Sequence, residues 1–219
     1  PPTYTSPSYG VDEVFMGSGG ANDMSSASYR GRASLGDTGV GNSSSTNYQA
    51  NSGFTTTPDP YIEFTVSGGT VDLGTLSTSA AKTGTATFSV RTYLASGYVV
   101  VTGSDPPNNG ARILAGMSSA AASSTGTEQF GINLVANTSP ATIGANPSQI
   151  PGSTYSFGTA AAGYNTANQY KYVKGDVIAS SSSSSGTTQY TITYLININA
   201  TTPGGQYAMN HILVATSTY

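Results

Sequence analysis

Apolar and polar residues alternate in segment after segment of this chain, and this alternation limits its fold more than any other feature. The strongest run is Tyr190–Ile198, in which every second residue is an apolar Tyr or Ile. The same period of two marks five further segments: Tyr61–Val66, Thr85–Leu94, Tyr98–Thr102, Thr127–Val135 and Gln206–Thr216. No segment has the i, i+3, i+4, i+7 spacing of an amphipathic helix. The pattern therefore predicts an all-β protein.

Turn sequences separate these segments and indicate the architecture. Ala95–Gly97 joins two of them, Asp105–Gly110 ends the second, and Thr202–Gly205 precedes the last. Short strands divided in this way predict an antiparallel β-sandwich of the Ig-like or jelly-roll type. The side chains expected to face its core are Ile62, Phe64, Val66, Phe88, Val90, Leu94, Phe130, Ile132, Leu134, Tyr190, Ile192, Tyr194, Ile196, Ile198, Tyr207, Met209, His211 and Leu213.

The composition supports this fold class and excludes several others. Ser, Thr and Gly supply 90 of the 219 residues, and all three are weak residues in a helix interior. A hydrophobic content of 37% and an aromatic content of 10% argue against a disordered chain. The net charge of −3 provides no basic surface for nucleic acid. No apolar run approaches the ~20 residues of a membrane-spanning helix.

Charge and cysteine usage bear on location. Charged residues make up only 8% of the chain, against ~25% in ordinary soluble domains, and this leaves few sites for trypsin-like proteases. The absence of Cys excludes thiol catalysis, Cys-ligated zinc and disulfides. A start at Pro1 fits a mature product whose secretion signal has been removed. We expect an extracellular or cell-surface protein.

The first 57 residues differ from the rest. Ser26–Tyr29 and Ser45–Tyr48 are near copies, which predicts a pair of strands within residues 21–57 joined by the Gly-rich segment Gly36–Asn42. The run Thr55–Pro60 then marks a boundary before the main sandwich, expected over residues 58–219.

Residues 1–20 are expected to form a tether that carries one isolated β extension. The segment Val11–Met16 can form a strand and lies between a Pro-rich and a Gly-rich stretch. A strand alone on a tether needs a sheet edge on which to pair. The candidate donor residues for such pairing are Val11, Val14, Phe15 and Met16.

No motif for catalysis or metal binding is present. A Ser-His-Asp triad or a histidine-supported zinc site would depend on His211, the only histidine, whose place in an alternating strand favours a structural role. The ten acidic residues are scattered, apart from the neighbours Asp12 and Glu13. We expect no enzyme activity, no catalytic residues, no cofactor and no metal site.

Four weaker alternatives remain open from the sequence. Oxygen-rich loops for calcium occur at Asn22-Asp23, Gly36–Asn42 and Asp105–Asn109. Aromatic platforms for a carbohydrate would involve Tyr155, Phe157, Tyr164, Tyr170 and Tyr172. Glycosylation triplets begin at Asn42, Asn137 and Asn199, and a Lys–Asn crosslink would involve Lys82, Lys171 or Lys174.

Three segments carry a resemblance to a known group. Ser28–Phe54, Gly131–Thr138 and Tyr170–Asp176 resemble secreted surface β-sandwich proteins of candidate-phylum bacteria, a group that implies no particular activity. The run Ile198–Tyr207 is similar to the last hairpin of many bacterial cell-surface sandwiches. More loosely, the layout is similar to pilin-type filament subunits, in which an N-terminal strand completes the next subunit.

The leading expectation for function is a structural subunit of an extracellular filament or pilus. Strand donation by Val11–Met16 would join each copy to the next in a helical homopolymer, because a head-to-tail contact does not close. The alternative is a monomeric adhesin or carbohydrate-binding module, with cell-surface glycans as partners.

Overall fold

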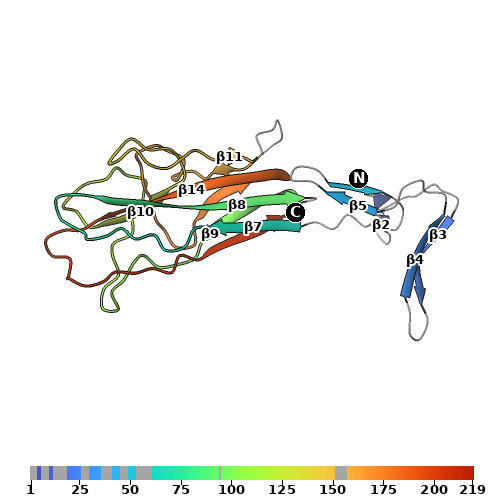
Figure 1. Ribbon diagram of the computed structural model, residues 1–219, viewed down its shortest axis with the longest axis horizontal. Coiled ribbons are helices and arrows are strands. Elements are labelled where there is room, and N and C mark those ends of the chain that lie inside the picture. Colours follow the sequence, from blue (N-terminus) through green and yellow to red (C-terminus); the bar gives the residue numbers. More distant parts are fainter. Residues whose placement is uncertain are drawn as a thin grey trace. The chain divides into compact units, whose positions relative to one another are not determined.

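The computed structural model describes residues 61–93, 95–150 and 157–219, apart from the side chain of Tyr93, and the backbone of six strands within the first 52 residues. The chain divides into two compact units, Pro1–Asp59 and Pro60–Tyr219 (Figure 1). The described residues contain no helix, so none of them could cross a membrane as a helix.

The described strands of the first unit form three two-stranded ladders. β1 (Tyr4–Thr5) pairs with β2 (Gly10–Val11), β3 (Gly19–Ser25) with β4 (Arg30–Leu35), and β5 (Gly41–Ser44) with β6 (Gln49–Ser52). The expected single pair of strands is therefore two pairs. The near-copied segments fall between the strands of each pair, at positions outside the described residues, and such short connections favour local pairing.

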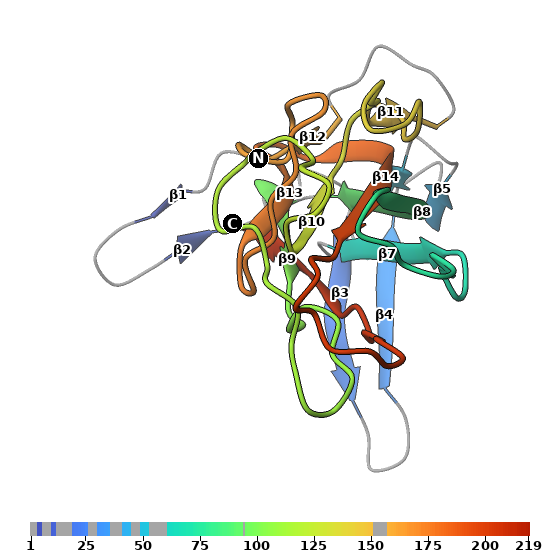
Figure 2. The ribbon, with the colours of Figure 1, turned by 90° about the vertical axis from the view of Figure 1, so that its left-hand side faces the viewer.

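The second unit is an antiparallel β-sandwich, which confirms the predicted fold class. One sheet has the order β10-β14-β8-β7, with β11 beside β14, and the other has the order β12-β13-β9-β15. The first sheet contains β7 (Tyr61–Ser67), β8 (Lys82–Tyr93), β10 (Gln129–Asn133), β11 (Ser148–Gln149) and β14 (Ser185–Asn197). The second contains β9 (Gly97–Thr102), β12 (Thr159–Ala160), β13 (Val177–Ser181) and β15 (Leu213–Thr218). Figure 2 shows the two layers end-on.

The core consists mainly of the alternating residues expected to face inward. Phe88, Val90, Phe130 and Ile132 are at most 1% exposed. The rings of Phe88 and Tyr190 stack with centroids 4.9 Å apart, and the Tyr190 hydroxyl lies 2.7 Å from that of Tyr98. Leu94, also expected in the core, lies outside the described residues.

The outer face of β14 departs from simple alternation. Thr193, Leu195 and Asn197 are at most 2% exposed. Leu195 packs with Met117 and Tyr170, whereas Thr193 lies beside Asn137 and the Asn197 amide donates to Ser123 and Gln129. From Ile192 to Asn197, β14 is therefore buried on both sides. A strand in this position no longer needs a polar row facing water.

The two sheets differ in length, and this difference creates the feature of greatest functional interest. β8 and β14 have 12 and 13 residues, whereas β9 and β15 each have six. Irregular segments cover the remaining inner face of the longer sheet, since Leu114, Tyr172, Tyr207 and Met209 all pack against the core.

The last predicted strand is only partly formed. Leu213–Thr218 is β15, but residues 206–212 make only scattered hydrogen bonds instead of a ladder. The side chains predicted to face the core nevertheless do so, because residues 207, 209, 211, 213 and 215 are partly buried and those between them are exposed. We refer to residues 206–215 as the arm.

Candidate binding groove

In the described part of the chain, the sandwich is open along one side, where β7 and β15 are the edge strands of the two sheets. On the opposite side, the edge of β10 is covered: Phe130 N donates to Ala115 O (2.8 Å) and Ile132 N donates to Lys171 O (2.9 Å). Within the described part of the chain, no strand pairs with the outer side of β7 or of β15. These two edges lie near each other, since β7 and β15 are in contact.

Burial decreases toward this open side. In the central strands, inward residues such as Phe88 and Val100 are at most 1% exposed. In β7, Ile62 and Phe64 are only partly buried and Val66 is 55% exposed, although all three lie on the inward row. The inward Leu213 of β15 is likewise only partly buried. The core is therefore incompletely covered at this edge.

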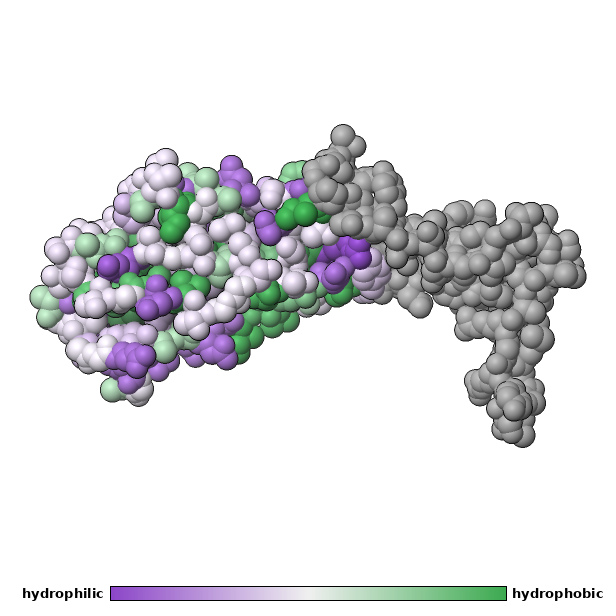
Figure 3. All heavy atoms as spheres, viewed as in Figure 1, coloured by the Kyte–Doolittle hydropathy of each residue, from purple (hydrophilic) through white to green (hydrophobic). Residues whose placement is uncertain are grey.

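A groove of about 1230 Å³ occupies the gap. Ala86, Ile192 and Ile196 of the longer sheet form its floor, while Phe64 and Val66 stand on one side and the arm lies on the other. Figure 3 shows apolar patches on a surface that is otherwise neutral or polar. The described charged residues that line the groove are Asp72 and, when protonated, His211, so its interior is suited to an uncharged, largely apolar guest.

The segment after β7 narrows the groove by folding over a glycine. A Cβ atom on Gly84 would lie 2.6 Å from Val71 Cγ1 and 2.7 Å from Leu73 Cδ2. Only glycine allows these two side chains to approach the sheet so closely. Val71, Leu73 and Leu76 thereby pack against the core and line the groove wall beside β7.

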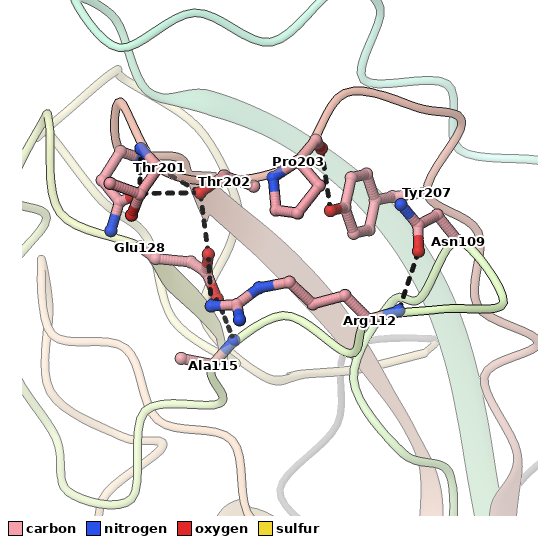
Figure 4. A network of polar contacts seen from close by, with 9 residues as sticks. Asn109, Arg112, Ala115, Glu128, Thr201, Thr202, Pro203 and Tyr207 are labelled. Carbon is pink, nitrogen blue, oxygen red and sulfur yellow. Dashed lines mark hydrogen bonds and ion pairs between the residues drawn. The ribbon is translucent and has the colours of Figure 1, made fainter.

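A buried carboxylate fastens the loop that leads into the arm (Figure 4). Glu128, with a side chain only 5% exposed, receives hydrogen bonds from Arg112 (3.0 and 3.1 Å), from Ala115 N (3.0 Å) and from the Thr202 hydroxyl (2.7 Å). Desolvation raises the pKa of Glu128, but these hydrogen bonds and the charge of Arg112 outweigh it and hold the pKa below its ordinary value. The carboxylate therefore joins three segments.

Replacing Glu128 should loosen this loop. Glu128→Ala removes the acceptor of Ala115 N, the ion-pair partner of Arg112 and one of the two acceptors of the Thr202 hydroxyl, which also bonds to Asn199 Oδ1. Since hydrogen bonds to a charged group are the stronger ones, we expect a loss of about 1–3 kcal/mol in the free energy of unfolding. Urea denaturation measures the change. Glu63→Ala is the matched control, because Glu63 pairs with Arg91 but its side chain is 55% exposed, and its loss should stay within about 1 kcal/mol. Equal losses would show that the Glu128 network does not stabilise the loop.

His211 anchors the arm from within the groove. Its Nε2 lies 2.8 Å from Thr102 Oγ1, and its Nδ1 lies 2.8 Å from the Tyr194 hydroxyl. The Thr102 hydroxyl also donates to the Tyr172 hydroxyl, which in turn donates to Ser104 O. Because the one Thr102 proton is used in this way, Nε2–H donates to Thr102 and Nδ1 accepts from Tyr194. Burial lowers the pKa of His211 to about 4, so the ring is neutral at pH 7.

The donor residues expected from the sequence are only partly placed. Val11 belongs to β2 and pairs with Tyr4 of its own chain, whereas Val14, Phe15 and Met16 lie outside the described residues. The ladder that holds Val11 has two residue pairs. Isolated two-stranded ladders are only marginally stable in water.

The residues considered for other chemistry have structural roles. His211 bonds to Thr and Tyr hydroxyls, so its two ring nitrogens have no Ser or carboxylate partner among the described residues. Tyr164, Tyr170 and Tyr172 are at most 2% exposed and cannot stack on a sugar, whereas Phe157 is 43% exposed. Tyr155 lies outside the described residues.

The described residues bear on some members of the remaining alternatives. Lys171 and Lys174 form ion pairs with Asp176 (2.6 Å) and Asp105 (2.9 Å), neither of which is an Asn. Asn137 is 2% exposed and its amide donates to Asn133 and Val135, so it is not accessible for glycosylation. The described part of the chain contains no group of three His, Cys, Asp or Glu side chains that could hold a metal ion.

Sequence reasoning missed the groove and the Glu128 network. Glu128 is a single acidic residue at the start of an apolar strand, and Arg112 precedes it by 16 positions in a turn-rich segment. In a chain with only ten acidic residues, one beside a strand was a usable signal for a buried role.

No family model, curated protein or solved structure matches this chain.

Proposed function

We propose that this protein is a structural subunit of an extracellular filament, and that its copies join head-to-tail by strand addition at the open side of the sandwich. The observation that carries the proposal is the groove between two unpaired edges, where inward residues such as Val66 are exposed. An added strand would pair with a free edge and bury these residues.

The position of the groove supports a contact that does not close. Register places Tyr61, Tyr93 and Gly97 at one end of the sandwich, and Ser67, Thr102 and Leu213 at the other. The chain enters the sandwich at Tyr61, whereas the groove extends from Val66 and Leu213 at the opposite end. A segment that precedes Tyr61 therefore starts from the end opposite the groove. Repetition of such a contact generates a fibre.

The alternative, a monomeric adhesin or carbohydrate-binding module, receives less support. Sugar binding commonly uses exposed aromatic faces, and Phe157 is the exposed member among the described aromatic residues considered for this role. Negative-stain electron microscopy of the concentrated protein separates the two functions. Filaments of uniform width support the subunit; a monodisperse monomer at all concentrations contradicts it.

The filaments should resist salt. Only 17 of the 219 residues are charged, so the joint depends mainly on backbone hydrogen bonds of ~0.5–1.5 kcal/mol each and on apolar side chains that contribute ~1.5–3 kcal/mol apiece when buried. Sodium chloride screens exposed ion pairs and leaves these contributions largely intact. We expect filaments to sediment equally at low salt and at about molar salt, and to need a chaotrope for dissociation. Release of monomers by a salt wash would contradict strand addition.

A further inference from the structure

We propose that the arm, residues 206–215, is the edge that accepts the incoming strand, and that residues 11–16 of a second copy pair with it. This inference rests on the proposed function and specifies its partner and its site. The competing edge is β7, on the other side of the same groove.

The backbone of the arm is hydrogen-bonded on one side only. Ala208 exchanges two bonds with Asn108, Asn210 O accepts from the Ser104 hydroxyl, and Ile212 O accepts from Gly103 N. The backbone groups of Tyr207, Met209 and His211, which alternate with these residues, have no hydrogen-bond partner in the described part of the chain. Alternate residues of an extended chain direct their N–H and C=O groups to the same side. The arm therefore presents a row of free donors and acceptors on its outer side.

The two candidate edges differ in the charge they carry. Neither the arm nor the rest of β15 contains a carboxylate, Lys or Arg; His211 is neutral at pH 7. β7 contains Glu63, which pairs with Arg91, and follows Pro60. Charged residues and prolines at an edge are a common protection against strand addition. The arm has no such protection.

The length and side-chain pattern of the incoming segment fit this site. Six residues, Val11–Met16, extend ~20 Å as a strand, so the ten residues of the arm are long enough to pair with the whole segment. One row of this segment is Val11, Glu13 and Phe15; the other is Asp12, Val14 and Met16. The first row would bury Glu13 between two apolar residues, whereas the second leaves Asp12 at its end, where water can solvate it. Val14 and Met16 therefore face the groove floor.

Disulfide mapping tests the assignment, because the chain contains no cysteine and every crosslink comes from the introduced pair. Val14→Cys is combined in turn with a cysteine in the arm or a cysteine in β7. The arm set is Tyr207→Cys, Met209→Cys and Leu213→Cys; the β7 set is Ile62→Cys, Phe64→Cys and Val66→Cys. Paired strands lie ~5 Å apart and packed sheets ~10 Å apart, and a disulfide needs Cα atoms within ~7 Å.

The expected result is a series of crosslinked dimers, trimers and longer species that disappears on reduction. At least one variant of the arm set should give this series, and no variant of the β7 set should give it. Each variant is first shown to unfold at the temperature of the parent protein under reducing conditions. Crosslinked species with the β7 set alone would overturn the proposal that the arm is the acceptor, and would leave the filament proposal intact. Filaments that crosslink with neither set would also overturn it. A parent protein that forms no filaments would overturn both proposals.

Discussion

Removal of residues 1–20 should give a folded protein that no longer assembles. The described core of the sandwich, with residues such as Phe88 and Tyr190, lies within the compact unit Pro60–Tyr219, which the truncation leaves whole. The truncated chain therefore keeps its cooperative unfolding transition. Without Val11–Met16 it has no strand to donate, so we expect at least a 100-fold fall in sedimentable polymer at equal protein concentration, measured by ultracentrifugation and electron microscopy.

A point substitution separates strand donation from a general effect of shortening the chain. Val14→Asp keeps the full length but places a second carboxylate on the row expected to face the groove, and it should prevent assembly almost as completely as the truncation. Ser18→Asp adds the same charge outside the segment and should assemble normally. If the truncated protein polymerises like the parent, residues 1–20 do not supply the joint.

Much of the fold follows from the sequence because the apolar rows are long. The alternation through Tyr190–Ile198 and Phe88–Val90 required strands, and strands with one apolar face required a second layer. Two features depended on tertiary context instead. Residues 206–212 have the alternation of a strand, but scattered bonds to the segment after β9, such as those of Ala208 with Asn108, replace the ladder. Thr193 and Asn197 of β14 have the polarity of a solvent-facing row but are buried, and they bond to the polar side chains of neighbouring segments.

The candidate groove is harder to derive because it arises from a mismatch between elements. Its floor exists because β8 and β14 extend beyond the six-residue strands of the other sheet, and pattern analysis locates strand ends poorly. Its wall depends on Val71 and Leu73 folding over Gly84. Neighbouring residues in the sequence do not predict this contact. The proposed donor segment, by contrast, stays a prediction from the sequence, which rests on the β-competent residues of Val11–Met16 between a Pro-rich and a Gly-rich stretch.

Mild acid should weaken the sandwich through His211. Burial lowers the pKa of this side chain from 6.5 to about 4, so the unfolded chain binds a proton at a higher pH than the folded protein does. The contribution of the neutral ring is fully present above pH ~6.5 and is lost as pH falls toward ~4. A shift of this size corresponds to about 3 kcal/mol. The pKa of Glu128 is also lowered, from 4.5, so its contribution is lost only at lower pH.

Urea denaturation at pH 7.5 and pH 4.5 measures this loss, and His211→Gln provides the control. Glutamine can keep a hydrogen bond to Thr102 or Tyr194 but does not titrate, so the variant should be modestly less stable at pH 7.5 and lose much less stability on acidification. Since His211 holds the middle of the arm, filaments of the parent protein should also dissociate more readily at pH 4.5 than those of the variant. An equal loss of stability in both proteins between pH 7.5 and pH 4.5 would show that other groups cause the acid response. The arm would then keep its free backbone edge but not its dependence on the protonation of His211.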